Sequence, residues 1–112
     1  MAPIRNLTVD QGSSFSVTIE LSDALGNALD LTDYTYRAQL RKSYGSNTYT
    51  AFSVTVTNHP TDGQLTLSLT SEQTGALRAG RYVYDIEIEN DVEVIRVLEG
   101  IITVSQIGRA HV

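Results

Sequence analysis

Hydrophobic and polar residues alternate with a period of two along most of this 112-residue chain. In the clearest run, residues 14–21, every odd position is aromatic or aliphatic and every even position is Ser, Thr or Glu. Successive side chains of a strand point to opposite faces of its sheet, so this run predicts a strand with one apolar and one polar face. Four other runs alternate in the same way and predict further strands: residues 36–41, 52–57, 64–70 and 81–89.

Weaker alternation extends this set to an expected seven to nine strands, with the additional candidates at residues 6–9, 28–31, 92–98 and 101–104. The segments between strands are rich in residues that suit tight antiparallel turns, as in residues 23–27, 62–63 and 89–91. Gly100 interrupts the last apolar run. Because an isolated glycine in a strand often marks a bulge, we expect the final strand to kink there.

One short helical turn is expected near residues 71–77, with Ser71 as its N-cap and glycines at 75 and 80 limiting its length. A helix of one or two turns cannot carry the chain across a sheet between parallel strands. The pattern therefore predicts an all-β, immunoglobulin-like antiparallel β-sandwich.

The length is that of a single domain, predicted over residues 1–112, with residues 106–112 as a flexible or docking tail. The chain has no cysteine, which excludes disulfides, thiolate metal sites and cysteine nucleophiles. Stability must therefore come from packing alone.

The charge balance disfavours nucleic acid as a partner. Thirteen acidic and eight basic residues give a net charge of −5, and this sign repels phosphate backbones. Arg37, Arg41 and Lys42 form the only local basic group. No apolar run approaches the roughly twenty residues that cross a bilayer, and the N-terminus lacks the apolar segment of a signal peptide. We expect no membrane partner and synthesis in the cytoplasm.

Candidate chemistry is sparse. His59 lies in an inter-strand loop and His111 lies next to the C-terminus, and neither has an evident partner. The chain contains no Gly-x-Ser-x-Gly elbow and no phosphate-binding glycine motif. The sequence therefore predicts a protein that is not an enzyme, with no catalytic, cofactor-binding or metal-binding residue.

Three polar groups remain as candidates for other roles. Oxygen ligands for calcium could come from Asp23, Asn27, Asp30 and Asp33, although such residues more often stabilise turns, and ion binding stays open. An acidic row is predicted on the solvent face of one strand by Asp85, Glu87 and Glu89, either to discourage edge pairing or to meet a basic partner. A candidate interaction loop is flanked by Tyr44 and Tyr49.

Three segments carry a resemblance to a known family: DGQLTL at residues 62–67, AGRYVYDIEI at residues 79–88 and RVLEG at residues 96–100. In their order, these segments resemble small immunoglobulin-like β-sandwich virion proteins of tailed phages, especially those of cyanobacterial myophages. They are more loosely similar to the N-terminal domain of the baseplate upper protein of phages that infect Gram-positive bacteria.

The resemblance implies a non-enzymatic virion structural or assembly protein of a tail, neck, baseplate or capsid. Such a protein acts through contacts with other virion subunits or with further copies of itself, and it is located in the virion after synthesis in the host cytoplasm. The alternative is a carbohydrate- or receptor-binding module that uses the loop between Tyr44 and Tyr49 as a stacking platform.

Overall fold

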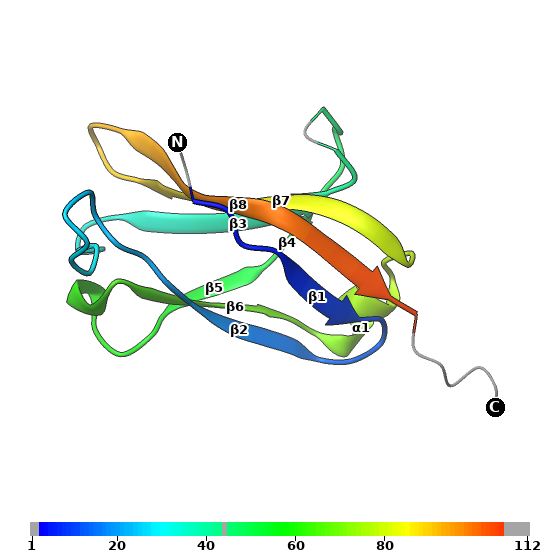
Figure 1. The fold of residues 1–112 in the computed structure, drawn as a ribbon. Coiled ribbons are helices and arrows are strands. Elements are labelled where there is room, and N and C mark those ends of the chain that lie inside the picture. The colour runs from blue at the N-terminus through cyan, green and yellow to red at the C-terminus, as the bar shows by residue number, and fades with distance from the viewer. Residues whose placement is uncertain (1–2, 44, 107–112) are drawn as a thin grey trace.

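A computed structural model describes residues 3–43 and 45–106, and in it two β-sheets pack face to face (Figure 1). Eight strands lie in these residues: β1 (Leu7–Asp10), β2 (Phe15–Glu20), β3 (Thr35–Arg41), β4 (Thr50–Ala51), β5 (Ser53–Val56), β6 (Gln64–Leu69), β7 (Gly80–Glu89) and β8 (Val94–Ser105). One sheet has the order β1-β8-β7-β3-β4, and the other has the order β2-β6-β5.

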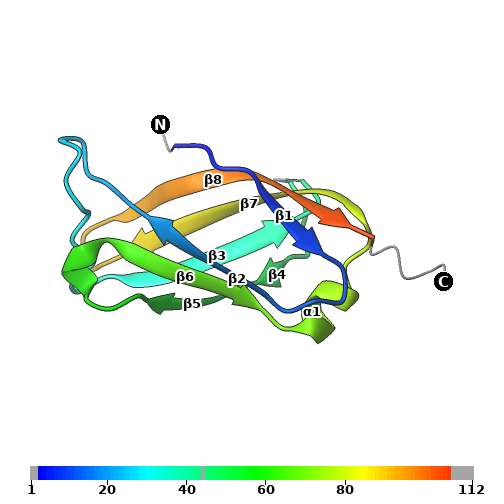
Figure 2. The ribbon, with the colours of Figure 1, turned by 60° about the horizontal axis from the view of Figure 1, so that its bottom comes forward.

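This strand order confirms the predicted immunoglobulin-like β-sandwich. The chain divides between two sheets, as in immunoglobulin-type sandwiches: one sheet holds β1, β3, β4, β7 and β8, and the other holds β2, β5 and β6. The pairing is antiparallel except between β1 and β8, which run parallel from Leu7 opposite Ile102 to Asp10 opposite Ser105. The first strand therefore leaves one sheet at Asp10 and the chain enters the other at Phe15 (Figure 2).

The core lies between the sheets and uses the inward positions that the alternation predicted. Its most deeply buried side chains come from both layers: Val9, Ile19, Leu31, Leu40, Leu65, Leu67, Tyr84, Ile86, Ile88, Ile102 and Val104. Burying a large aliphatic side chain contributes about 1.5–3 kcal/mol. This apolar layer is therefore what holds the two sheets together.

The strand predicted over residues 52–57 is β5, and the short β4, which belongs to the other sheet, directly precedes it. Ala51 pairs with Gln39 in one sheet, whereas Ser53 pairs with Ser68 in the other. Phe52, at the crossing, is buried, and its N–H donates to the Ala38 carbonyl at 2.9 Å. Every second side chain faces the core both before and after the crossing. Periodicity alone therefore could not reveal the change of sheet.

Two expectations about strands were wrong. Residues 28–31 form no strand, because only an isolated bridge joins Ala28 to Ser22. The two segments predicted at 92–98 and 101–104 form one continuous strand, β8. At Gly100, where a kink was expected, the pairing with β7 continues without a shift of register.

The irregularity in β8 lies at Val97 instead of Gly100. Ile86 pairs with Leu98 and Glu87 with Arg96, so Val97 is the extra residue, whereas Gly100 stays in register opposite Tyr84. A Cβ on Gly100 would lie 1.9 Å from the Arg5 carbonyl oxygen. The glycine is therefore required by the close approach of the N-terminal segment, whose Arg5 carbonyl accepts a hydrogen bond of 2.6 Å from the Tyr84 hydroxyl.

The predicted helical turn is α1 (Ser71–Gly75), and its N-cap is Thr70 instead of Ser71. Thr70 and Gln73 form a capping box, in which each side chain accepts from the backbone N–H of the other. Thr74 is buried, and its hydroxyl accepts from Gly12 N–H at 3.0 Å and donates to the Ser13 carbonyl at 2.8 Å. The helix thereby fixes the link between β1 and β2.

A second helical turn, η1 (Pro60–Asp62), follows β5 and was not predicted. Within residues 3–43 and 45–106, no helix has the length and apolar composition that crossing a membrane requires. The predicted tail falls almost entirely on residues 107–112, which lie outside the described residues.

Candidate functional site

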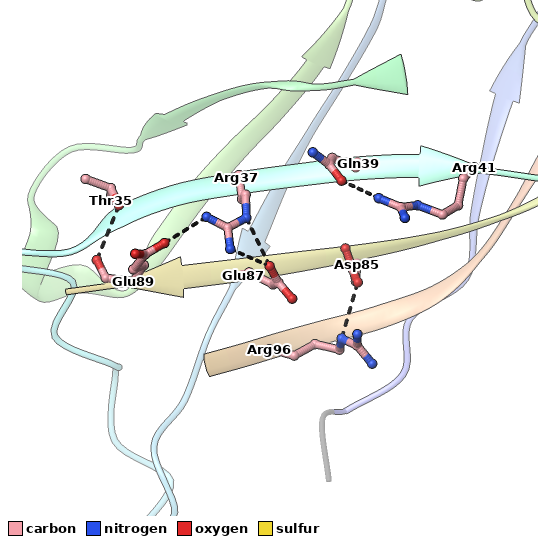
Figure 3. Close-up of polar contacts among 8 residues, drawn as sticks. All are labelled: Thr35, Arg37, Gln39, Arg41, Asp85, Glu87, Glu89 and Arg96. Carbon is pink, nitrogen blue, oxygen red and sulfur yellow. Dashed lines mark hydrogen bonds and ion pairs between the residues drawn. The ribbon is translucent and has the colours of Figure 1, made fainter. Parts of the chain in front are cut away.

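The outer face of the five-stranded sheet carries an ordered set of charged side chains (Figure 3). Arg37 on β3 lies opposite Glu87 on β7 in the register of the two strands. The guanidinium of Arg37 contacts the Glu87 carboxylate at 2.8 Å and the Glu89 carboxylate at 2.9 Å. One arginine thus joins two carboxylates of the neighbouring strand, which holds all three side chains in a defined arrangement.

A second group of ion pairs lies on the next pair of strands. Arg96 on β8 contacts Asp85 at 3.2 Å and Glu99 at 3.6 Å. Because of the bulge at Val97, Arg96 pairs with Glu87 in the register of β7 and β8. Its side chain nevertheless contacts Asp85, two residues earlier on β7. Two arginines, one on β3 and one on β8, therefore pair with four carboxylates, three on β7 and one on β8.

This arrangement corrects the expectation of an acidic row that protects a sheet edge. Asp85, Glu87 and Glu89 lie on β7, which is the central strand of its sheet and has no free edge. The surface is a mixture of both charges and not a negative stripe. Alternation correctly placed these side chains on the solvent face, but it could not reveal which strands lie beside β7.

Apolar side chains flank this charged set at both ends of the β7–β8 pair. Val83 lies opposite Ile101 in the register, and both are on the solvent side. Ile101 is 37% exposed, and Val94, near the β7–β8 hairpin, is 54% exposed. We define the interaction face as Arg37, Val83, Asp85, Glu87, Glu89, Val94, Arg96, Glu99 and Ile101. The sequence signal for its apolar part was Val83, which interrupts the charged set on the outward side of β7.

Asp85 is the most buried carboxylate of the interaction face, with a side chain 18% exposed. Desolvation raises the pKa of Asp85 above its usual 3.8, against the attraction of Arg96 and Arg41. At pH values between the pKa of Asp85 in the unfolded chain and its higher pKa in the folded chain, the folded chain binds more protons than the unfolded chain. The contribution of Asp85 to the free energy of unfolding therefore falls as the pH rises through the window that begins near 3.8.

We expect Asp85→Asn to remove this pH dependence. At pH 7 the variant should match the parent or exceed it in free energy of unfolding by about 0.5 kcal/mol, because the amide needs less desolvation. Urea unfolding at pH 7 and in the window just above 3.8 measures the difference, which should shrink at the lower pH. A loss above about 1 kcal/mol at pH 7 would show instead that the pair with Arg96 outweighs burial.

The candidate interaction loop is seen in part. Tyr44 lies outside the described residues, whereas Tyr49 is 54% exposed just before β4. The Arg41 guanidinium lies 5.4 Å from the centroid of the Tyr49 ring, which is within the range of a cation–π contact. A shallow hollow of about 180 Å³ beside them is lined partly by Lys42, Leu77 and Tyr82.

The four residues considered for calcium act within turns. Asp23 accepts hydrogen bonds from the Leu25 and Asn27 N–H groups at 2.9 and 3.0 Å. Asp30 accepts from the N–H and hydroxyl of Thr32, and these bonds lower the pKa of Asp30. Asp33 has a positive φ of 68°.

The remaining candidates for chemistry show no assembled site. Over the residues that the structure describes, no three His, Asp or Glu side chains gather as metal ligands would. His59 is exposed at the start of η1, and His111 lies outside the described residues.

A groove of about 860 Å³ opens on the side of the sandwich between the end of β2 and the first half of β8. Leu21 and Leu29 line one wall, and Ile95 and Val97 line the other. Pro3 also lines the groove, and its carbonyl accepts a hydrogen bond of 3.1 Å from Glu99 N–H on β8. No sequence pattern indicated this groove, because the residues that line it are far apart in the chain.

Comparison with known proteins supports the fold and no more. No family model and no curated protein sequence matches the chain. Among solved structures, InlP of Listeria monocytogenes aligns over 90% of this chain with a TM-score of 0.51 and 16% identity. This chain spans about a quarter of that protein, since it covers 26% of it.

Two further matches among solved structures have lower TM-scores. The Lin-41 filamin domain aligns with a TM-score of 0.46 and 20% identity, covering 88% of this chain and 82% of the domain. The four N-terminal immunoglobulin domains of Dscam1 isoform 6.9 align with a TM-score of 0.43 and 19% identity, covering 92% of this chain and 23% of theirs.

Proposed function

We propose that this chain is a non-enzymatic structural protein of a tailed-phage particle, which acts by binding other protein subunits through the interaction face. The proposal of a phage particle is supported by the sequence resemblance at residues 62–67 and 79–100. Its partners are then virion subunits, and its place is the virion after synthesis in the bacterial cytoplasm.

The observation that carries the binding role is the ordered charge on the interaction face. Arg37 and Arg96 each contact two carboxylates, so their side chains are already held when a partner arrives. Side chains that are ordered beforehand lose less conformational entropy on binding. Arginine is also enriched in protein interfaces, and the interaction face presents the partly exposed Ile101 as well.

Arg37→Glu tests this proposal. The change places a third carboxylate beside Glu87 and Glu89, so it should reduce incorporation into particles at least about tenfold, by removing complementary charge and adding repulsion. The measurement is mass spectrometry of density-gradient-purified particles from cells that express the tagged chain. Arg78→Glu makes the same charge change on an exposed loop outside the interaction face and should incorporate like the parent.

Two results would contradict the proposal. The parent chain could stay in the soluble fraction and never enter particles, which would remove the phage role. Alternatively, Arg37→Glu could incorporate as well as Arg78→Glu while both remain folded by circular dichroism, which would remove the role of the interaction face.

Carbohydrate or receptor binding is the alternative, and the half-exposed ring of Tyr49 beside its hollow favours it. Sugar rings stack on exposed tyrosine faces, although Arg41 already lies over this ring. A glycan array separates the two functions. Saturable binding that Tyr49→Ala abolishes would support the alternative, whereas a structural protein should give no signal.

A further inference from the structure

We propose that two copies of this chain associate by pairing the free edges of their β2 strands in antiparallel orientation, which joins two three-stranded sheets into one sheet of six. The inference names a partner surface that the interaction face does not include. It rests on the proposed function in one respect, namely that the chain acts by binding protein.

The outer edge of β2 offers backbone groups that no described segment of the chain pairs. β2 is the last strand of its sheet and pairs only with β6. Leu21 N–H donates to the Gly63 carbonyl at 2.7 Å. The backbone N–H and C=O groups of the odd-numbered residues of β2 therefore point toward β6. In an antiparallel ladder the intervening residues point the other way, so the N–H and C=O groups of Ser16, Thr18 and Glu20 face outward.

This edge lacks the features that usually block strand addition. β2 has six residues in regular pairing, with no proline, no lysine and no bulge. The other outer strands of the two sheets are shorter: β1 and β5 have four residues each and β4 has two. β2 also lies along the lower margin of the molecule in Figure 1.

A twofold axis through Thr18 gives a self-complementary register. Thr18 then lies opposite Thr18 of the second copy, and Ser16 lies opposite Glu20, so that the two Glu20 carboxylates never face one another. These three pairs exchange roughly six backbone hydrogen bonds. Two copies of a chain with a net charge of −5 repel one another. Twofold pairing at the β2 edge brings no like charges together, so this edge favours self-association.

Side chains on both faces of the joined sheet also match. On the core side, Val17, which is only partly buried, lies opposite Ile19 of the second copy and would gain an apolar neighbour. On the outer side, Thr55, Thr66 and Thr18 lie in one cross-strand row of a single copy. This row of hydroxyls continues into the second copy, and its small side chains do not obstruct close strand pairing.

The test uses single cysteines, since the natural chain has none. In the proposed dimer the two Thr18 Cα atoms lie about 5.5 Å apart, within the range that a disulfide spans. Oxidation of Thr18→Cys should therefore give a covalent dimer in high yield. Thr66→Cys is the matched control: it lies on the same face one strand further in, so the two Cα atoms are roughly 15 Å apart and should not be joined.

A non-covalent test uses sedimentation velocity of the cysteine-free chain. The parent should dimerise with a dissociation constant between about 1 μM and 1 mM. Thr18→Pro removes an outward N–H and should weaken dimerisation at least about tenfold, whereas Thr18→Val keeps that N–H and should dimerise like the parent. Circular dichroism confirms that each variant is folded.

The proposal is overturned if the parent is monomeric at 1 mM protein, or if Thr18→Cys and Thr66→Cys cross-link equally. It is also overturned if Thr18→Pro dimerises as well as Thr18→Val. These outcomes are independent of particle incorporation, because Arg37→Glu tests the interaction face and leaves the β2 edge unchanged. Failure of either proposal can therefore be recognised separately.

Discussion

Ile19→Asp is expected to prevent folding. Ile19 is 1% exposed between the two sheets, and a carboxylate there has no partner and no access to water. Burying an unpaired charge belongs to the few changes that cost more than about 4–5 kcal/mol, which approaches the whole stability of a domain of this size. Circular dichroism should show loss of the β signal at 25 °C, and proton NMR should lose its dispersion.

Thr18→Asp is the matched control, because it places the same group one residue earlier on the exposed face of β2. Its cost should stay within about 1 kcal/mol, chiefly from the lost contact with the Thr66 hydroxyl at 3.3 Å. Equal tolerance of the two substitutions would mean that β2 does not have the register described above.

Gly100→Ala is expected to destabilise the chain by about 3 kcal/mol, which is large for the addition of one methyl group. The new Cβ would lie 1.9 Å from the Arg5 carbonyl oxygen and 3.0 Å from the Tyr84 ring. The N-terminal segment must then move away from β8, which breaks the hydrogen bond from the Tyr84 hydroxyl to Arg5. Urea unfolding measures the loss.

Gly75→Ala controls for the general effect of replacing glycine. Gly75 ends α1, and an added Cβ there meets only the Gly12 Cα at 3.7 Å, which is ordinary contact. Alanine should therefore be neutral or should stabilise by up to about 1 kcal/mol through the unfolded state. If Gly100→Ala were as well tolerated as Gly75→Ala, the packing of residues 3–6 against β8 would have to be different.

The sequence predicted the local features of this fold well, for a physical reason. In strands such as β2 and β6, one face is buried and the other is in contact with solvent, so the residue type at each position indicates its face. The alternation is not informative where neither face of a segment is fully buried, or where the segment passes from one sheet to the other. It therefore missed the crossing at Phe52 and predicted a strand at residues 28–31 that does not form.

The candidate site depended on information that no single strand carries. Arg37, Asp85 and Arg96 were all visible as outward residues, but their contacts depend on β7 lying between β3 and β8. The reason for Gly100 likewise comes from Arg5, which lies 95 residues earlier in the chain. Only the three-dimensional pairing of distant segments reveals such contacts.

The central claim, that the interaction face binds protein, is tested most directly by hydroxyl-radical footprinting of the chain free and in purified particles. Ile101 and Val94, on the interaction face, should lose most of their reactivity on assembly. Leu25 and Val92, which are 85% and 88% exposed, lie on loops outside that face and should keep theirs. Unchanged oxidation of Ile101 and Val94 in particles that contain the chain would contradict the claim.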